Sequence, residues 1–123
     1  MNWDDYPNFT EAEFTCSHTG KCEMQASFMD KLQALRTAYG KAMTVTSGYR
    51  HETHPIEAAK DKPGIHTMGL AVDIACGGAD AYNIMRLAFE LGFTGIGVAQ
   101  SGRNRFLHLD TYTKPPRSNV WSY

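Results

Sequence analysis

The sequence lacks any apolar run close to the roughly 20 residues that a membrane-spanning helix requires. Its first residues, MNWDDYPN, also lack the basic and apolar segments of a secretory signal peptide. We therefore expect a protein that is synthesised in the cytoplasm without a signal peptide and that has no membrane partner.

An excess of charge of either sign is also missing. The 12 Lys and Arg residues are balanced by 13 Asp and Glu residues, so the formal net charge is -1 at pH 7. Without a basic field, nothing attracts the phosphates of nucleic acid or an anionic membrane surface. We expect no nucleic-acid partner.

Cysteine is scarce. The 3 cysteines are too few for the disulfide framework of a small secreted domain. Stability must then come from a hydrophobic core. Hydrophobic residues make up 42% of the 123 residues and charged residues 20%, which are ordinary values for a soluble protein. A chain of this length builds one core and not two, so we expect a single domain, residues 1–123. We also expect a monomer, although no residue pattern indicates the oligomeric state.

Three segments have helical signatures. Thr10 and Glu13 have the spacing of a capping box, which predicts a short helical turn. Residues 25–39 carry apolar side chains at spacings of four, three and four, and Gly40 is suited to end that helix. Residues 80–91 carry a second buried stripe.

Alternating apolar and polar residues predict strands at 43–47, 70–75, 95–98 and 105–111. The polar segment 51–64 is interpreted as a long surface loop, a feature that usually belongs to a site, and the tail as irregular. The connections are too short for repeated crossovers. We therefore expect an α+β fold, with a small antiparallel sheet and helices packed on it.

Two of these strands are expected to place polar side chains on one face of the sheet. Asp73 in one strand, and His108 and Asp110 in another, alternate with the apolar residues Val72, Ile74, Leu107 and Leu109. His66 lies in the loop just before the first strand. Two imidazoles and one carboxylate are ordinary ligands of a catalytic zinc ion, with a fourth position left for water. An exposed His66 and a buried, hydrogen-bonded His108 are the alternative.

Three blocks resemble those of the M15 zinc peptidases: TSGYR at 46–50, HTMGLAVDI at 66–74 and FLHLDT at 106–111. This family contains D-alanyl-D-alanine carboxypeptidases, phage endolysins and murein endopeptidases. Segments 14–22 and 117–123 are similar to the first and last segments of the compact M15 subgroup, so the resemblance covers nearly the whole chain. It implies the fold of the hedgehog and D-Ala-D-Ala-peptidase group.

Carried over residue by residue, the resemblance implies that His66, Asp73 and His108 bind one zinc ion. It also implies that Arg50 binds a substrate carboxylate or the polarised carbonyl, a task that suits the guanidinium fork. The alternative for Arg50 is a structural arginine that pairs with an acidic loop residue.

The general base is less well marked. Many M15 peptidases carry Glu or Asp three residues before the last ligand, but here that position is Arg105. Asp110 is the nearest acid on the same strand face, and we predict that it takes the proton from the water activated by zinc. Alternatively, Asp110 orients a zinc ligand.

Cys16, His18 and Cys22 allow three interpretations: a second, structural metal site, a disulfide or free thiols. Cys76 follows a predicted strand and is expected to be a small buried side chain.

We expect a zinc-dependent peptidase that hydrolyses peptidoglycan stem or cross-link peptides, either as a carboxypeptidase or as an endopeptidase. The resemblance implies a phage lysis enzyme that acts on the cell wall after its release. The alternative is a non-catalytic module of the same fold, which keeps zinc but only binds wall peptide or a protein partner. The absence of an acid at position 105 favours that alternative.

Overall fold

In the computed structural model, which describes residues 1–123, five strands form one sheet in the order β1-β2-β4-β3-β5. Neighbouring strands are antiparallel except β3 and β5, which are parallel. The strands are β1 (Thr44–Ser47), β2 (Ala71–Ala75), β3 (Gly95–Ala99), β4 (Phe106–Asp110) and β5 (Asn119–Ser122).

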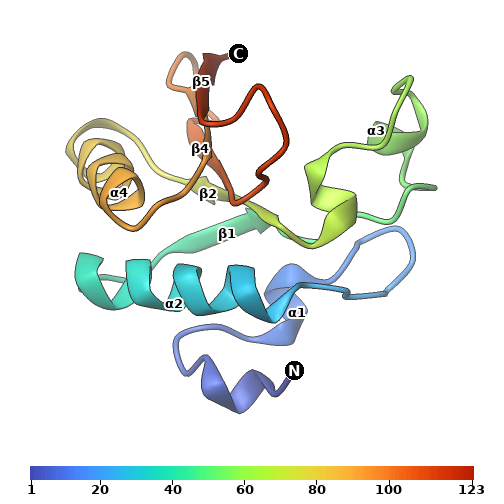
Figure 1. Cartoon of the computed structure of the whole chain (residues 1–123), viewed down its shortest axis with the longest axis horizontal. Coiled ribbons are helices and arrows are strands. Elements are labelled where there is room, and N and C mark those ends of the chain that lie inside the picture. The colour runs from blue at the N-terminus through green and yellow to red at the C-terminus, as the bar shows by residue number, and fades with distance from the viewer.

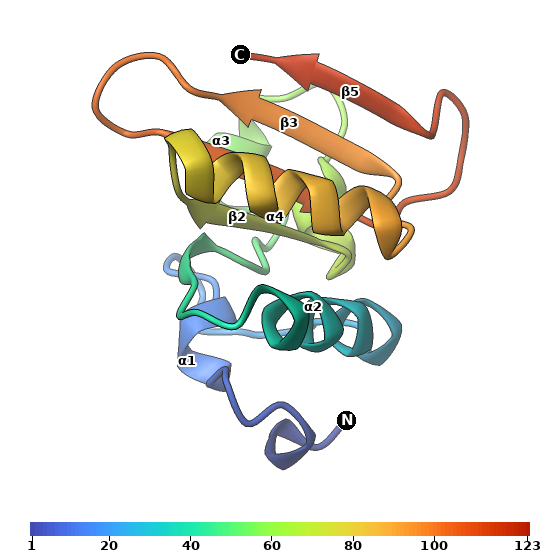
Figure 2. The same cartoon turned by 90° about the vertical axis from the view of Figure 1, so that its left-hand side faces the viewer.

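The helical elements lie on different sides of this sheet. They are η1 (Trp3–Asp5), α1 (Glu11–Phe14), α2 (Ala26–Tyr39), α3 (Pro55–Ala58), η2 (Ile65–Met68) and α4 (Gly78–Glu90). In Figure 1, α4 lies on one side of the strands and the segment with α3 and η2 on the other. Figure 2 shows α4 in front of the sheet and α2 below it. None of the helices has both the length and the apolar character needed to cross a bilayer.

Local sequence signals account for the helix ends. The capping box at Thr10 and Glu13 is present at the start of α1, where the Thr10 N–H donates to the Glu13 carboxylate. Gly40 follows α2 with a φ of 76°, a left-handed conformation that glycine adopts without steric cost. Both predictions are confirmed.

The apolar face of the sheet packs against α2 and α4 around one core of 21 buried residues. Val72, Ile74, Leu107 and Leu109 are fully buried in it. Because side chains alternate along a strand, burying these four turns Asp73 and His108 to the opposite face. The core thus decides where the polar side chains lie.

The α+β class and the helices packed on a sheet are confirmed. The prediction that the tail is irregular is wrong, because Asn119–Ser122 forms strand β5. Its signal is weak because Asn119–Ser122 is short and its parallel pairing with β3 depends on residues far away in the sequence. The predicted helix 80–91 begins two residues earlier, at Gly78.

Two phenylalanines give a matched test of where the core lies. Phe28 on α2 is fully buried and meets Phe93 edge to face, whereas Phe89 on α4 is 58% exposed. We expect Phe28→Ala to lower the free energy of unfolding by about 3–5 kcal/mol, because it leaves a cavity. Phe89→Ala should change it by less than about 1 kcal/mol. Denaturant unfolding of both variants checks this, and equal losses would contradict the described core.

Candidate metal centre and its surroundings

The register of β2 and β4 brings two of the predicted ligands together. Asp73 on β2 lies directly opposite His108 on β4. The turn of η2, which ends at Gly69, places His66 against the same face. All three residues are buried, and one ligand atom from each lies within 4.8 Å of the others.

The three ligand atoms form a nearly equilateral triangle. His108 Nδ1 is 3.2 Å from His66 Nε2 and 3.2 Å from Asp73 Oδ1. His66 Nε2 is 3.3 Å from the same carboxylate oxygen. Tetrahedral ligands at about 2.0 Å from a zinc ion are separated by about 3.3 Å, so the spacing fits such an ion.

Hydrogen bonds on the outer sides of the two rings fix their tautomers. His66 Nδ1 donates to the Gly48 carbonyl at 2.8 Å, and His108 Nε2 donates to the Asp110 carboxylate at 2.7 Å. In the neutral rings, the inner nitrogens therefore carry lone pairs. His66 Nε2, His108 Nδ1 and Asp73 Oδ1 then face one another as three lone-pair donors, and none of these atoms carries a hydrogen. Such an arrangement is typical of a cation-binding site.

The charges around Asp73 keep it ionised. Burial raises the pKa of this carboxyl, but the imidazoles of His108 and His66 outweigh burial and hold the pKa well below its usual range. For His108, burial lowers the pKa, but the carboxylates of Asp110 and Asp73 outweigh that effect and raise it. Both shifts show that the electrostatic environment of Asp73 and His108 favours positive charge between their side chains.

Arg50 connects this group to the long loop. Its Nη2 donates to Asp73 Oδ2 at 3.3 Å and its Nη1 to Glu57 Oε2 at 3.1 Å. The Glu57 carboxylate, which is fully buried, also accepts from Lys60 Nζ and from the Gly64 N–H. Arg50 thus makes the ion pair with an acidic loop residue that the sequence left as an alternative.

The groups around Glu57 keep its buried carboxyl ionised. Burial raises the pKa of this carboxyl, but the Gly64 N–H, Lys60 and Arg50 together lower it below its usual range. The predicted loop 51–64 is therefore an ordered segment anchored at one buried carboxylate. It contains one short helix, α3, at Pro55–Ala58.

Asp110 lies on the far side of the His108 ring from the ligand triangle. Its carboxylate is fully buried and also accepts from Arg117 Nη2 at 3.1 Å and from the Tyr112 N–H at 3.2 Å. Burial raises the pKa of Asp110, but His108 and Arg117 outweigh it and lower the pKa. A Cβ at Gly95, which lies opposite on β3, would fall 2.3 Å from this carboxylate, so the glycine leaves room for Asp110.

A cavity of about 400 Å³ opens over the ligand triangle. One wall is aromatic: Trp121 from β5 lies 5.2 Å from the His108 ring, and Tyr123 lies 5.1 Å from Phe106. Three cationic side chains, Arg50, Lys60 and Arg117, also line the cavity, together with Ile56 and Ile65. Asp73 is the only acidic residue that lines the cavity, and Asp110 does not reach it.

Four residues that line this cavity or hold its lining in place were not predicted from the sequence. Glu57 and Lys60 carry no recognisable signal in the polar segment 51–64. Arg117 and Trp121 belonged to the family resemblance without an assigned task. Their places depend on the path of the loop and on the pairing of β5, and neither has a local sequence signature.

The three cysteines take no part in the metal centre. All three are free thiols, and Cys16, His18 and Cys22 do not form a group that could hold a metal. Burial raises the pKa of Cys16, but hydrogen bonds from His51 and Thr19 outweigh it and lower the pKa to about 7. Cys76 is half-buried, and burial raises the pKa of its thiol to about 11.

Comparison with known proteins identifies the family of the chain. No curated protein matches the chain. The profile of the family described as Peptidase M15 matches residues 7–110, which contain His66, Asp73, His108 and Asp110. Since the matched range covers most of the chain, the protein belongs to the M15 peptidase family and is a peptidase.

Proposed function

We propose that this peptidase is zinc-dependent and hydrolyses peptidoglycan stem or cross-link peptides, with His66, Asp73 and His108 as the zinc ligands. The observation that carries the proposal is the triangle of three lone-pair donors at 3.2–3.3 Å. Two imidazole nitrogens with one carboxylate suit zinc, whereas magnesium and calcium prefer oxygen ligands only.

Bound zinc would polarise the scissile carbonyl and lower the pKa of a coordinated water toward neutrality. Arg50 supplies fixed positive charge beside the ligands, because two carboxylates hold its guanidinium in place. Its remaining N–H groups are free to donate to a substrate carboxylate or to the oxygen of the polarised carbonyl.

The lining of the cavity supports an acidic peptide as substrate. Arg50, Lys60 and Arg117 surround a space whose other wall is aromatic. Stem and cross-link peptides of peptidoglycan carry free carboxylates, which can accept hydrogen bonds from the N–H groups that these cations do not use in their ion pairs. The aromatic wall would cover the apolar part of the bound peptide.

Of the two roles that the sequence left open for Asp110, we propose that it orients His108. Its carboxylate accepts the outer N–H of the His108 ring and is clamped by Arg117. A general base needs hydrogen-bond reach to the reacting water, and this carboxylate faces away from the cavity.

One observation favours the non-catalytic alternative. Apart from the proposed ligand Asp73, no acidic side chain lines the cavity to accept a proton. Incubating the zinc-loaded protein with muropeptides and identifying the products by mass spectrometry decides between the functions. Release of a terminal amino acid indicates a carboxypeptidase, and cleavage within a stem or cross-link indicates an endopeptidase. Binding without cleavage would support the non-catalytic module.

Metal analysis tests the proposed ligands. We expect one zinc ion per chain in the wild type, and loss of that ion in His66→Ala and His108→Ala. Zinc at 100 times its Kd should stabilise the wild type by about 2.7 kcal/mol and raise its Tm. His18→Ala serves as the control, because His18 is exposed and does not belong to the ligand group. Full zinc content in both ligand variants would refute the assignment.

Asp110→Asn separates the two roles of that residue. An orienting residue predicts zinc affinity lower by about 10- to 100-fold, with turnover restored by added zinc. A general base predicts unchanged zinc affinity and turnover lower by roughly 100-fold or more at any zinc concentration. Competition with a chromophoric chelator measures the affinity, and unchanged affinity would contradict our assignment.

Arg50→Lys tests a residue with two tasks. Lysine cannot bridge Glu57 and Asp73 with a planar fork, so we expect a loss of about 1–3 kcal/mol in the free energy of unfolding. We also expect kcat/KM to fall by roughly tenfold or more. Arg86→Lys is the control: it alters an exposed pair with Glu90 and should cost less than about 0.5 kcal/mol. An unchanged Tm in Arg50→Lys would show that the bridge does not hold the loop.

A further inference from the structure

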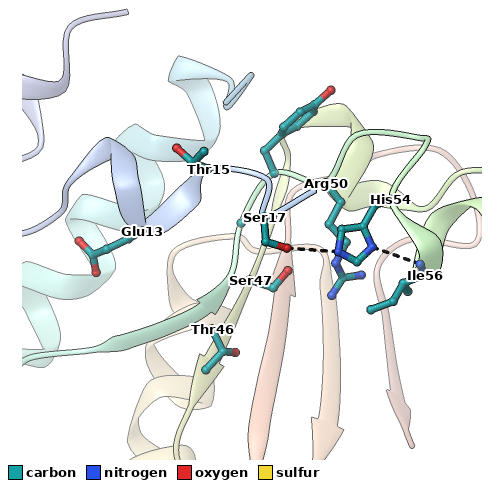
Figure 3. A pocket seen from close by; sticks show the side chains of 10 residues that line it. Glu13, Thr15, Ser17, Thr46, Ser47, Arg50, His54 and Ile56 are labelled. Carbon is teal, nitrogen blue, oxygen red and sulfur yellow. Dashed lines mark hydrogen bonds between the residues drawn. The ribbon is translucent and has the colours of Figure 1, made fainter. Parts of the chain in front are cut away.

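A second, polar groove adjoins the cavity over the ligand triangle. It has a volume of about 180 Å³, and Arg50 and Ile56 line both spaces, so the two meet at these residues. One side of the groove is the segment that follows α1 and the other is the end of β1 (Figure 3). Apart from Arg50 and from Gly48, whose carbonyl accepts from His66 Nδ1, its lining residues form no hydrogen bond with the side chains of the ligand triangle that the proposed function uses.

The groove offers hydrogen-bonding groups and little apolar surface. Ser17 contributes a hydroxyl from the segment after α1, and Thr46 and Ser47 contribute hydroxyls from β1. Figure 3 shows these three side chains between Glu13 at one end and Arg50 with His54 at the other. Such a lining matches the carbonyl and N–H groups of a peptide backbone better than an apolar side chain.

His54 sets the direction in which Ser17 can bond. The Ile56 N–H donates to His54 Nδ1 at 3.1 Å, so the proton of the neutral ring is on Nε2. His54 Nε2 lies 3.4 Å from Ser17 Oγ and donates to it. Figure 3 marks this bond and the bond from the Ile56 N–H with dashed lines. The hydroxyl proton of Ser17 remains free for an acceptor in the groove, such as a peptide carbonyl.

Strand β1 adds main-chain groups to this surface. It lies at an edge of the sheet and pairs with β2 only. An edge strand directs alternate N–H and C=O groups outward, where an extended peptide can pair with them. The register shifts between Val45 and Ser47, so Thr46 forms a bulge beside the groove.

We propose that this groove is a substrate subsite that holds an extended peptide segment continuing past Arg50 from the bond cleaved at the metal centre. The inference rests on the proposed peptidase function and extends it to a longer substrate. Its volume is below the roughly 300–1,000 Å³ of a pocket for a whole small molecule, which suits an extension of a neighbouring site.

Kinetics on a short and a long substrate test the subsite. The short substrate is the dipeptide unit that the wild type cleaves in muropeptides, blocked at its N-terminus, and blocked at its C-terminus as well if the muropeptide products identify an endopeptidase. The long ones carry two further residues on its N-terminal or on its C-terminal side. We expect one extension to raise kcat/KM by about tenfold or more, because remote binding energy lowers the barrier. In Ser17→Trp, whose side chain fills the groove, that ratio of long to short should fall to about one.

Lys21→Trp is the matched control, since Lys21 is exposed in the same loop but does not line the groove. This variant should keep the full ratio. A wild type that gains nothing from either extension, or a Ser17→Trp that keeps the gain, would overturn the subsite while leaving the peptidase function intact.

If the zinc-loaded wild type cleaves neither these substrates nor muropeptides, the proposed function fails and NMR decides the groove separately. Titration with a blocked stem pentapeptide should shift the backbone amide signals of Ser17 and Ser47, and Ser17→Trp should remove the shift at Ser47. Unperturbed signals at both residues would refute peptide binding in the groove.

Discussion

The register between β2 and β4 is the constraint on which the metal centre depends. Side chains alternate with a period of two, so a slip by one residue would turn His108 into the core and Leu107 toward the cavity. The four apolar neighbours of Asp73 and His108 are fully buried, and each contributes about 1.5–3 kcal/mol by that burial. The geometry of the ligand triangle therefore takes its rigidity from the hydrophobic core behind it.

Two buried carboxylates extend this rigidity to either side of the triangle. Glu57 holds Arg50 and Lys60 on one side, and Asp110 holds His108 and Arg117 on the other. No buried side-chain nitrogen or oxygen is left without a hydrogen-bond partner. Buried charges are tolerated only when they are paired in this way, so the two networks position the rim of the cavity as well as neutralising it.

The sequence contained enough to predict the triangle, but not its surroundings. Alternation in two strands placed Asp73 and His108 on one face, and the family blocks pointed to His66 and Arg50. Glu57 could not be assigned, because its contacts depend on how the loop after Arg50 folds back. Trp121 could not be placed either, since β5 pairs with β3 across a long separation and in parallel. Residues within a periodic strand or a short sequence block could thus be predicted. Residues whose position depends on contacts between distant segments could not.

On the face of β3 that is turned away from the core, glycine occupies the two positions opposite Asp110 and His108. Gly95 lies across from Asp110 and Gly97 from His108, and a Cβ at Gly97 would fall 2.6 Å from the Trp121 indole nitrogen. This strand serves as a spacer that lets side chains from β4 and β5 lie over it. Larger side chains at Gly95 and Gly97 would collide with Asp110 and Trp121, so these two positions cannot carry new substrate contacts. Diversity would have to be introduced from the loop that carries Lys60 and from the segment that carries Trp121, whose side chains already form the outer walls.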